Sequence, residues 1–141
     1  MDDKYETILA VDDVGLVLTV VVEVLKSAHF HVLQASSGRE ALEVASNYPG
    51  RIDLLLSDIE MPGMTGIQLG ETLKVLRPKM HVMFMSGFAD GRLLVLNYGW
   101  AFIDKPFVAS KLIEMIDSVL HSPDKSQGLR QYDKRKETGQ E

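Results

Sequence analysis

The stretch IDLLLSDIEMPGMTG, residues Ile52 to Gly66, decides the fold class of this chain. Its first part, Ile52 to Leu56, is a short apolar run without the regular alternation of a half-exposed strand, so it predicts a strand buried on both faces, as in parallel sheets. Asp58 follows where this strand ends, and Pro62-Gly63 then turns the chain away. Because ligands bind outside the carboxyl ends of strands in open parallel sheets, Asp58 is a candidate site residue.

Strand and helix patterns alternate along the chain. Apolar, β-branched runs predict strands at Thr7–Val11, Phe30–Ala35, Ile52–Leu56, His81–Met85 and Trp100–Ile103. Apolar residues at three- and four-residue spacing predict helices over Gly15–His29, between Ser37 and Tyr48, between Thr65 and Pro78, and over Asp90–Asn97 and Ala109–His121. Ser37 with Glu40, and Thr65 with Gln68, have the spacing of a capping box. This alternation predicts an α/β fold, a doubly wound parallel sheet.

Length and composition limit the class of protein. The 141 residues predict one domain over 1–121, and the polar composition of 122–141 predicts a flexible C-terminal tail. The net charge of −5 argues against a nucleic-acid or anionic-membrane partner. The chain has no cysteine, which excludes disulfides and thiol catalysis. With no signal-peptide pattern and no apolar stretch long enough for a bilayer, we expect a cytoplasmic protein.

Four of the five predicted strands end in groups suited to phosphate or metal chemistry, namely Asp12-Asp13, Asp58, Ser86 and Lys105. Right-handed crossovers place these ends at one edge of the sheet. Three carboxylates gathered there repel one another unless a cation joins them, and hard oxygen ligands suit Mg²⁺. Lys105 and Ser86 offer an ammonium and a hydroxyl to a phosphate. The set therefore predicts a carboxylate nucleophile that forms an aspartyl phosphate.

Each of these residues also has a simpler interpretation. A lone aspartate after a strand is more often a helix cap or a turn residue, and a lone Lys-Pro is usually a solvated turn. Taken together, the simpler interpretations are less convincing than a functional site, because capping does not require acids, a hydroxyl and a lysine to recur at successive strand ends.

In these motifs the chain resembles the receiver domains of response regulators, from Thr7 to about His121. The motifs are Asp12-Asp13, DIEMPGMTG around Asp58, MSG at Met85 to Gly87, and DKPF at Asp104 to Phe107. The resemblance implies a flavodoxin-like fold, with a five-stranded parallel sheet in the order 2-1-3-4-5 and five helices. It also implies a two-component signalling protein that catalyses only its own phosphorylation and dephosphorylation.

The resemblance assigns a role to each matching residue. Asp58 is the phosphoacceptor, while Ser86 and Lys105 contact the phosphoryl group. Mg²⁺ binds Asp13, Asp58 and the backbone carbonyl of Glu60, and Asp12 holds it through water. Ser86 and Phe102 are the switch positions, with Phe102 in place of the commoner tyrosine. The donor is a phosphohistidine on a sensor histidine kinase or histidine phosphotransfer protein, and the receiver is a monomer or weak homodimer.

Two hypotheses concern the surface around Asp58. If Val17, Val21, Val24 and Leu25 of the first helix face the sheet, then Val14, Leu18 and Val22 form an exposed apolar stripe that docks the donor protein. The alternative is that the helix is rotated and all three are core residues. The second hypothesis is that the Glu60 carboxylate, beside the path of attacking water, influences the lifetime of the phosphoryl group.

The function has alternatives of other classes. The chain could be a Mg²⁺-dependent phosphohydrolase with an aspartyl-phosphate intermediate, for which Glu60 fits as a general acid, or an interaction module that is never phosphorylated. The leading prediction is a phosphorylation-controlled switch without an output domain, acting on a downstream protein. Both a stand-alone regulator and the receiver of a hybrid kinase fit the sequence.

Overall fold

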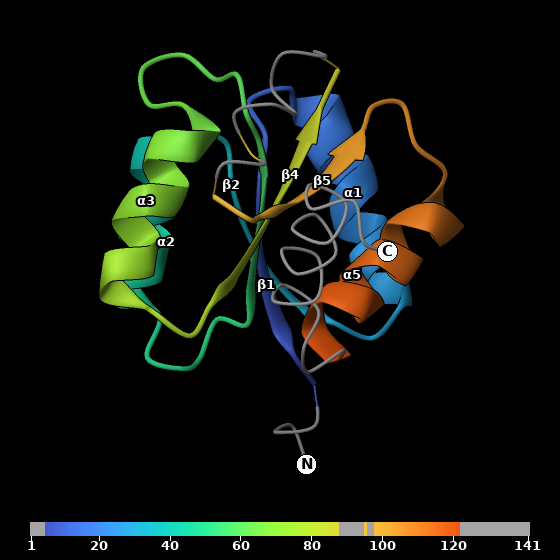
Figure 1. Cartoon of the computed structure of the whole chain (residues 1–141), viewed down its shortest axis with the longest axis horizontal. Helices are drawn as coiled ribbons and strands as arrows, with labels where there is room; N and C mark the ends of the chain where they lie inside the picture. Colours follow the sequence, from blue (N-terminus) through green and yellow to red (C-terminus); the bar gives the residue numbers. More distant parts are fainter. Residues whose placement is uncertain (1–4, 88–94, 96–97, 122–141) are drawn as a thin grey trace, which may run out of the picture.

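A five-stranded parallel sheet forms the centre of the molecule (Figure 1). The computed structural model describes residues 5–87, 95 and 98–121. The strands are β1 (Thr7–Val11), β2 (His31–Ala35), β3 (Leu54–Asp58), β4 (His81–Ser86) and β5 (Ala101–Asp104). They lie in the order β2-β1-β3-β4-β5, and every pair of neighbours is parallel. The flavodoxin-like order predicted from the resemblance is therefore confirmed.

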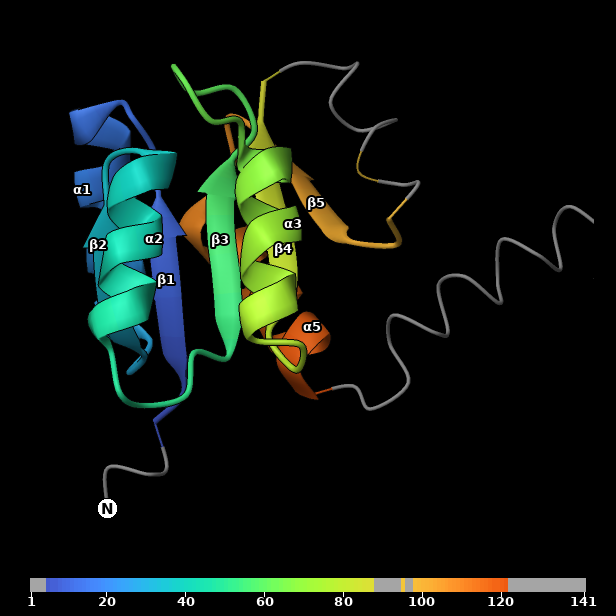
Figure 2. The same cartoon turned by 90° about the vertical axis from the view of Figure 1, so that its left-hand side faces the viewer.

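Helices cover both faces of the sheet (Figures 1 and 2). One face carries α1 (Gly15–Ser27) and α5 (Ala109–His121), and the other carries α2 (Gly38–Asn47) and α3 (Gly66–Leu76). The helix predicted over Asp90–Asn97 lies, apart from Val95, outside the described residues, as does the predicted tail 122–141. None of the helices in the described part of the chain is long and apolar enough to span a membrane.

The central strands are buried on both faces, as the apolar runs predict. All five residues of β1 and all five of β3 are buried. Alternate residues of β3 enter different clusters, because successive side chains point to opposite faces. Leu55 packs with α3 on one side, while Leu54 and Leu56 pack with α1 and α5 on the other.

The third strand begins two residues later than predicted. Its pairing with β1 starts at Leu54, opposite Ile8. Asp53, which precedes the strand, instead accepts a hydrogen bond at Oδ2 from the Thr7 backbone N–H, at 2.8 Å, and contacts Arg51 at 2.9 Å. Asp58 becomes the last residue of β3, so its position is set by the sheet as well as by the turn that follows.

The stripe predicted on α1 is wrong for two of its three residues. Leu18 and Val22 are core residues with only 7% and 5% of their surfaces exposed. Val14, at the N-cap, is exposed, but the apolar residues on the outer face of the helix are Leu16 and Val20. Apolar residues occur on nearly every side of this helix, so their spacing does not fix its rotation. The alternative interpretation, a rotated helix with all three residues in the core, is right for Leu18 and Val22 and wrong for Val14, which is exposed.

The two capping boxes differ. In α3 the box is complete, because Gln68 N donates to Thr65 Oγ1 at 3.1 Å and Thr65 N donates to Gln68 Oε1 at 2.9 Å. In α2 Ser37 Oγ accepts from Glu40 N at 3.0 Å, but the Glu40 carboxylate accepts from Ser36 N at 2.7 Å instead of Ser37 N. The second box is therefore only half formed.

Candidate functional site

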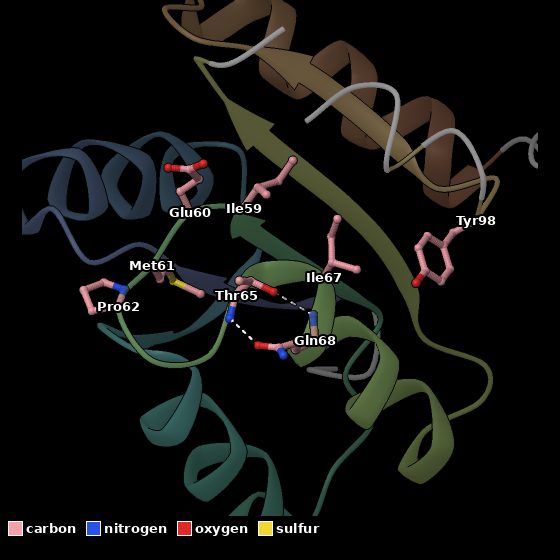
Figure 3. A pocket seen from close by; sticks show the side chains of 8 residues that line it. All are labelled: Ile59, Glu60, Met61, Pro62, Thr65, Ile67, Gln68 and Tyr98. Atoms are coloured by element: carbon pink, nitrogen blue, oxygen red, sulfur yellow. Dashed lines mark hydrogen bonds between the residues drawn. The ribbon is translucent and has the colours of Figure 1, made fainter. Parts of the chain in front are cut away.

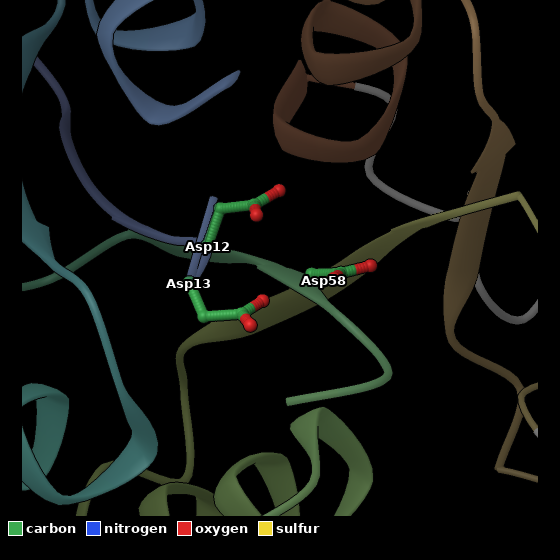
Figure 4. Close-up of side chains that lie close together, drawn as sticks. All are labelled: Asp12, Asp13 and Asp58. Atoms are coloured by element: carbon green, nitrogen blue, oxygen red, sulfur yellow. The ribbon is translucent and has the colours of Figure 1, made fainter. Parts of the chain in front are cut away.

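Three carboxylates meet at the carboxyl ends of β1 and β3. Asp12 and Asp13 follow β1, and Asp58 ends β3; because Val11 pairs with Ser57, both ends lie at the same level of the sheet. One oxygen from each of the three acids lies within 4.8 Å of the others (Figure 4). Asp12 and Asp58 are buried, whereas Asp13 is exposed. The clustering predicted from the strand ends is confirmed.

Lys105 reaches this cluster from the residue after β5. Its Nζ lies 2.9 Å from Asp12 Oδ2 and 3.4 Å from Asp58 Oδ1. The backbone fixes its starting point, since Lys105 N donates to the Ser86 carbonyl at 2.9 Å. One ammonium thus faces two buried carboxylates.

The protonation of Asp58 reflects opposing influences. Burial raises the pKa of Asp58, and the ammonium of Lys105 lowers it, while the nearby Asp12 carboxylate raises it again. Hydrogen bonds from Lys105 and from the Ile59 N–H, which donates to Asp58 Oδ1 at 3.0 Å, also lower it. The net result is a pKa above the ordinary value for aspartate. A further cation at the site would favour the charged carboxylate that a nucleophile requires.

The donor set fits a hard divalent cation. Three carboxylates supply oxygen ligands, and the exposed Asp13 leaves room for the waters that Mg²⁺ retains. One lysine cannot neutralise three acids, so the cluster keeps a negative charge that a cation would offset. Asp12, Asp13 and Asp58 could therefore hold a metal ion. The roles of the Glu60 carbonyl as a ligand and of water at Asp12 stay predictions.

The two switch positions occupy different places. Ser86 ends β4, is buried, and lies at the same edge of the sheet as the acids, since Asp58 pairs with its neighbour Met85. Phe102 lies within β5 opposite Phe84, and its half-buried ring packs against the cluster beneath α2 and α3. Their roles in switching stay predictions.

A cavity of about 560 Å³ borders the site on the side of α3 (Figure 3). Its lining comes from the β3–α3 loop, the first turn of α3 and, across the cavity, Tyr98. Glu60 lines it with an exposed carboxylate. The Tyr98 hydroxyl donates to the Glu71 carboxylate of α3, and its ring stacks on Trp100 with centroids 4.4 Å apart.

Sequence reasoning missed two residues next to Asp58. Ser57 is fully buried, and its Oγ donates to the Asp58 carbonyl at 2.7 Å. Gly66 approaches the same carbonyl so closely that a Cβ atom there would lie 2.1 Å from the oxygen. A hydroxyl inside an otherwise apolar strand was the available signal for Ser57. Nothing in the sequence distinguishes Gly66 from an ordinary glycine after a capping residue.

The fold and the cluster of acids with a lysine together define a receiver-type domain. The family model of the response regulator receiver domain matches residues 8–117, and the chain belongs to that family. It is a receiver domain of two-component signalling, as the resemblance predicts.

Known relatives include both large and small proteins. The chain is 33% identical over 121 residues to the sensor kinase CckA of Brucella abortus (strain 2308), covering 84% of this chain but 13% of that kinase. It is 32% identical over 85 residues to the sporulation initiation phosphotransferase F of Bacillus subtilis (strain 168), covering 60% of this chain and 67% of that protein. The crystal structure of the receiver domain from the hybrid histidine kinase CckA is 34% identical, with a TM-score of 0.71, covering 82% of this chain and 99% of that one.

Proposed function

We propose that this receiver is a phosphorylation-controlled switch in which Asp58 accepts a phosphoryl group from a phosphohistidine. The observation that carries the proposal is the contact of Lys105 with both Asp12 and Asp58, at 2.9 and 3.4 Å, inside a cluster of three carboxylates. A structural ion pair needs one acid for one lysine. Two further acids at the same point are costly for folding and useful for holding a metal ion and a phosphoryl group.

The transfer is a displacement at phosphorus. A carboxylate oxygen of Asp58 forms the new P–O bond, the P–N bond to the donor imidazole breaks, and its electron pair stays on the ring nitrogen. The Lys105 ammonium, now shared between carboxylates, can contact a phosphoryl oxygen and offset its charge. The Ile59 N–H, which donates to Asp58 Oδ1, is a second donor beside the reacting oxygen. Mg²⁺ held by Asp12, Asp13 and Asp58 would supply further positive charge.

The partners follow from this chemistry. The donor is a sensor histidine kinase or a histidine phosphotransfer protein, and the receiver turns over no other substrate. The similarity to a segment of a kinase and to most of a small phosphotransferase is compatible with a receiver inside a hybrid kinase and with a stand-alone regulator. We place the receiver in the cytoplasm, as a monomer or weak homodimer, with a protein as its downstream target.

Mass spectrometry of the intact protein tests the phosphoacceptor. After incubation with Mg²⁺ and acetyl phosphate, the wild type should gain one phosphate and Asp58→Ala none. Glu23→Gln, which removes an exposed acid on α1, is the matched control and should be phosphorylated like the wild type. An unmodified wild type, or an adduct that persists in Asp58→Ala, would contradict the proposal. Steady release of phosphate from a generic phosphate ester would instead favour the phosphohydrolase.

A further inference from the structure

The hydroxyl of Ser57 is buried inside β3, immediately before the phosphoacceptor. Ser57 is 0% exposed and pairs with Val11 of β1 and Phe84 of β4. A hydroxyl in such apolar surroundings costs free energy unless it finds a hydrogen-bond partner. Its partner is the backbone carbonyl of Asp58, to which Ser57 Oγ donates at 2.7 Å.

The same carbonyl is confined from the side of α3. A Cβ atom on Gly66 would lie 2.1 Å from the Asp58 oxygen, a distance that no side chain could occupy. Gly66 N also donates to the Ile59 carbonyl, at 2.7 Å. The first residue of α3 therefore lies directly against the backbone that follows Asp58, and the Asp58 oxygen sits between Gly66 and the Ser57 hydroxyl.

The peptide bond between Asp58 and Ile59 connects these contacts to the reactive side chain. Its C=O and N–H belong to one rigid plane and point in opposite directions. The carbonyl end is held by Ser57, and the N–H end donates to Asp58 Oδ1 at 3.0 Å. A rotation of the plane would therefore disturb both hydrogen bonds at once.

We propose that Ser57 is a positioning residue, whose hydroxyl fixes the Asp58–Ile59 peptide plane so that the Ile59 N–H orients the Asp58 carboxylate for phosphoryl transfer. This inference rests on the proposed role of Asp58 as phosphoacceptor. Without the hydroxyl, the peptide plane rotates more freely, and the Ile59 N–H holds Asp58 Oδ1 in a less fixed direction, while the Lys105 contact at 3.4 Å remains. A smaller fraction of molecules then presents the carboxylate in the reactive orientation, and the rate of the chemical step falls.

Two variants of Ser57 and one control test the role. Ser57→Ala removes the hydroxyl, and Ser57→Thr keeps it. Ser27→Ala removes a comparable hydroxyl-to-carbonyl bond, 2.9 Å from Ser27 Oγ to Glu23 O, on the exposed side of α1. The first readout is the NMR chemical shift of the Ile59 amide without phosphodonor. The second is the rate of autophosphorylation as a function of acetyl phosphate concentration, in the presence of Mg²⁺.

We expect Ser57→Ala to shift the Ile59 amide resonance and to lower the maximal rate about 2- to 10-fold, the equivalent of one net hydrogen bond, with little change in the donor concentration at half-maximal rate. Ser57→Thr should restore both the amide resonance and the rate. Ser27→Ala should change neither. If Ser57→Ala does not fold, Ser57→Cys, which keeps the size and weakens the donor, replaces it in the same comparison.

An unchanged Ile59 amide in Ser57→Ala would overturn the inference, whatever happens to the rate. So would a Ser57→Thr variant that recovers the Ile59 resonance without recovering the rate. The proposed function fails separately, through a wild type that is not phosphorylated, since the Ile59 amide reports on Ser57 without any phosphodonor.

Discussion

At the scale of single residues, repulsion within the acid cluster should lower the stability of the metal-free protein. Asp13 adds a third negative charge beside two buried carboxylates that share one lysine. We expect Asp13→Asn to stabilise the metal-free protein by about 1 kcal/mol, because it removes like-charge repulsion and, being exposed, leaves no buried group unpaired. Thermal unfolding in a chelating buffer measures this.

The same comparison of the wild type with Asp13→Asn in the presence of Mg²⁺ is the complementary control. A ligand that binds only the folded state raises its stability with concentration, so Mg²⁺ should raise the melting temperature of the wild type more than that of Asp13→Asn. An Asp13→Asn variant that is less stable than the wild type without metal would contradict the repulsion argument.

Glu60 is the residue on which the lifetime of the phosphoryl group is predicted to depend. Its exposed side chain lies two residues past Asp58, at the border of the 560 Å³ cavity. On the hypothesis that its carboxylate influences attacking water, we expect Glu60→Asn to change the dephosphorylation rate several-fold while leaving the fold intact. Loss of the phosphate adduct over time, followed by mass spectrometry, measures the rate. Glu43→Gln on the outer side of α2 is the control, and equal rates in all three proteins would refute the role.

The site residues were predictable to different extents. Asp12, Asp58 and Lys105 follow from the sequence, because parallel strands bring their carboxyl ends to one edge whatever the details of packing. The importance of Ser57 and Gly66 does not follow from the sequence. It depends on their contacts with the Asp58 carbonyl, which are fixed only when α3 packs against the end of β3.

At the scale of elements, the spacing of apolar residues did not fix the rotation of α1. The observed rotation predicts different stabilities for variants of two leucines of this helix. Leu18 is buried between α1 and the sheet, whereas Leu16, two residues earlier, is 77% exposed. Leu18→Ala should cost about 2–5 kcal/mol of unfolding free energy by leaving a cavity. Leu16→Ala should change the stability by no more than about 0.5 kcal/mol. Urea unfolding compares the two, and similar losses would mean that the helix is not rotated as described.

A second prediction at this scale concerns Arg77, which lies at the C-cap of α3 and binds the end of α2. Its guanidinium donates to the carbonyls of Ala45 and Tyr48, both at 2.9 Å, and of Gly50, at 2.8 Å. The Ala45 and Tyr48 carbonyls lie at the end of α2, where the helix itself offers no partner, and Gly50 follows in the loop. Arg77→Met should lower the unfolding free energy by about 2 kcal/mol, since hydrogen bonds from a charged donor are lost.

A matched variant for Arg77 is Arg39→Met, because Arg39 is exposed near the start of α2. It should leave the unfolding midpoint close to that of the wild type. If Arg39→Met and Arg77→Met lower the stability equally, the contacts of Arg77 with α2 contribute nothing specific.

At the scale of the whole molecule, the parallel sheet and its burial on both faces follow from the alternation of apolar runs with helical periodicity, because a parallel sheet needs a helix between successive strands. The order of the strands does not follow from this alternation; it was predicted from the resemblance to receiver domains. Contacts between distant ends of the chain do not follow from any local pattern. His121, the last residue of α5, lies next to Glu6, which precedes β1; His121 Nε2 is 2.7 and 2.9 Å from the two Glu6 carboxylate oxygens. This contact joins residues at the two ends of the described chain.

The stabilising effect of the contact between His121 and Glu6 should depend on pH. Hydrogen bonds with Asp117, whose Oδ1 is 2.6 Å from His121 Nδ1, and with Glu6 raise the pKa of His121 above its usual 6.5. A pKa raised by folding stabilises the folded state fully below the unfolded value, and the contribution disappears as the pH rises through the folded value. His121→Gln should therefore be less stable than the wild type at about pH 5.5, by up to about 1 kcal/mol for so exposed an ion pair, and equally stable at about pH 9.

Urea midpoints of the wild type and His121→Gln, measured across this pH range, test the effect of the contact. The titration of all other groups affects both proteins equally and cancels in the difference between them. His81→Gln provides a control of opposite sign. Burial, with Lys74 and Arg51 nearby, lowers the pKa of His81, so the wild-type residue loses stability as the pH falls below 6.5 and the substitution relieves that loss. A His121→Gln difference that is constant with pH, or that grows toward alkaline pH, would show that the imidazolium does not hold α5 to the start of β1.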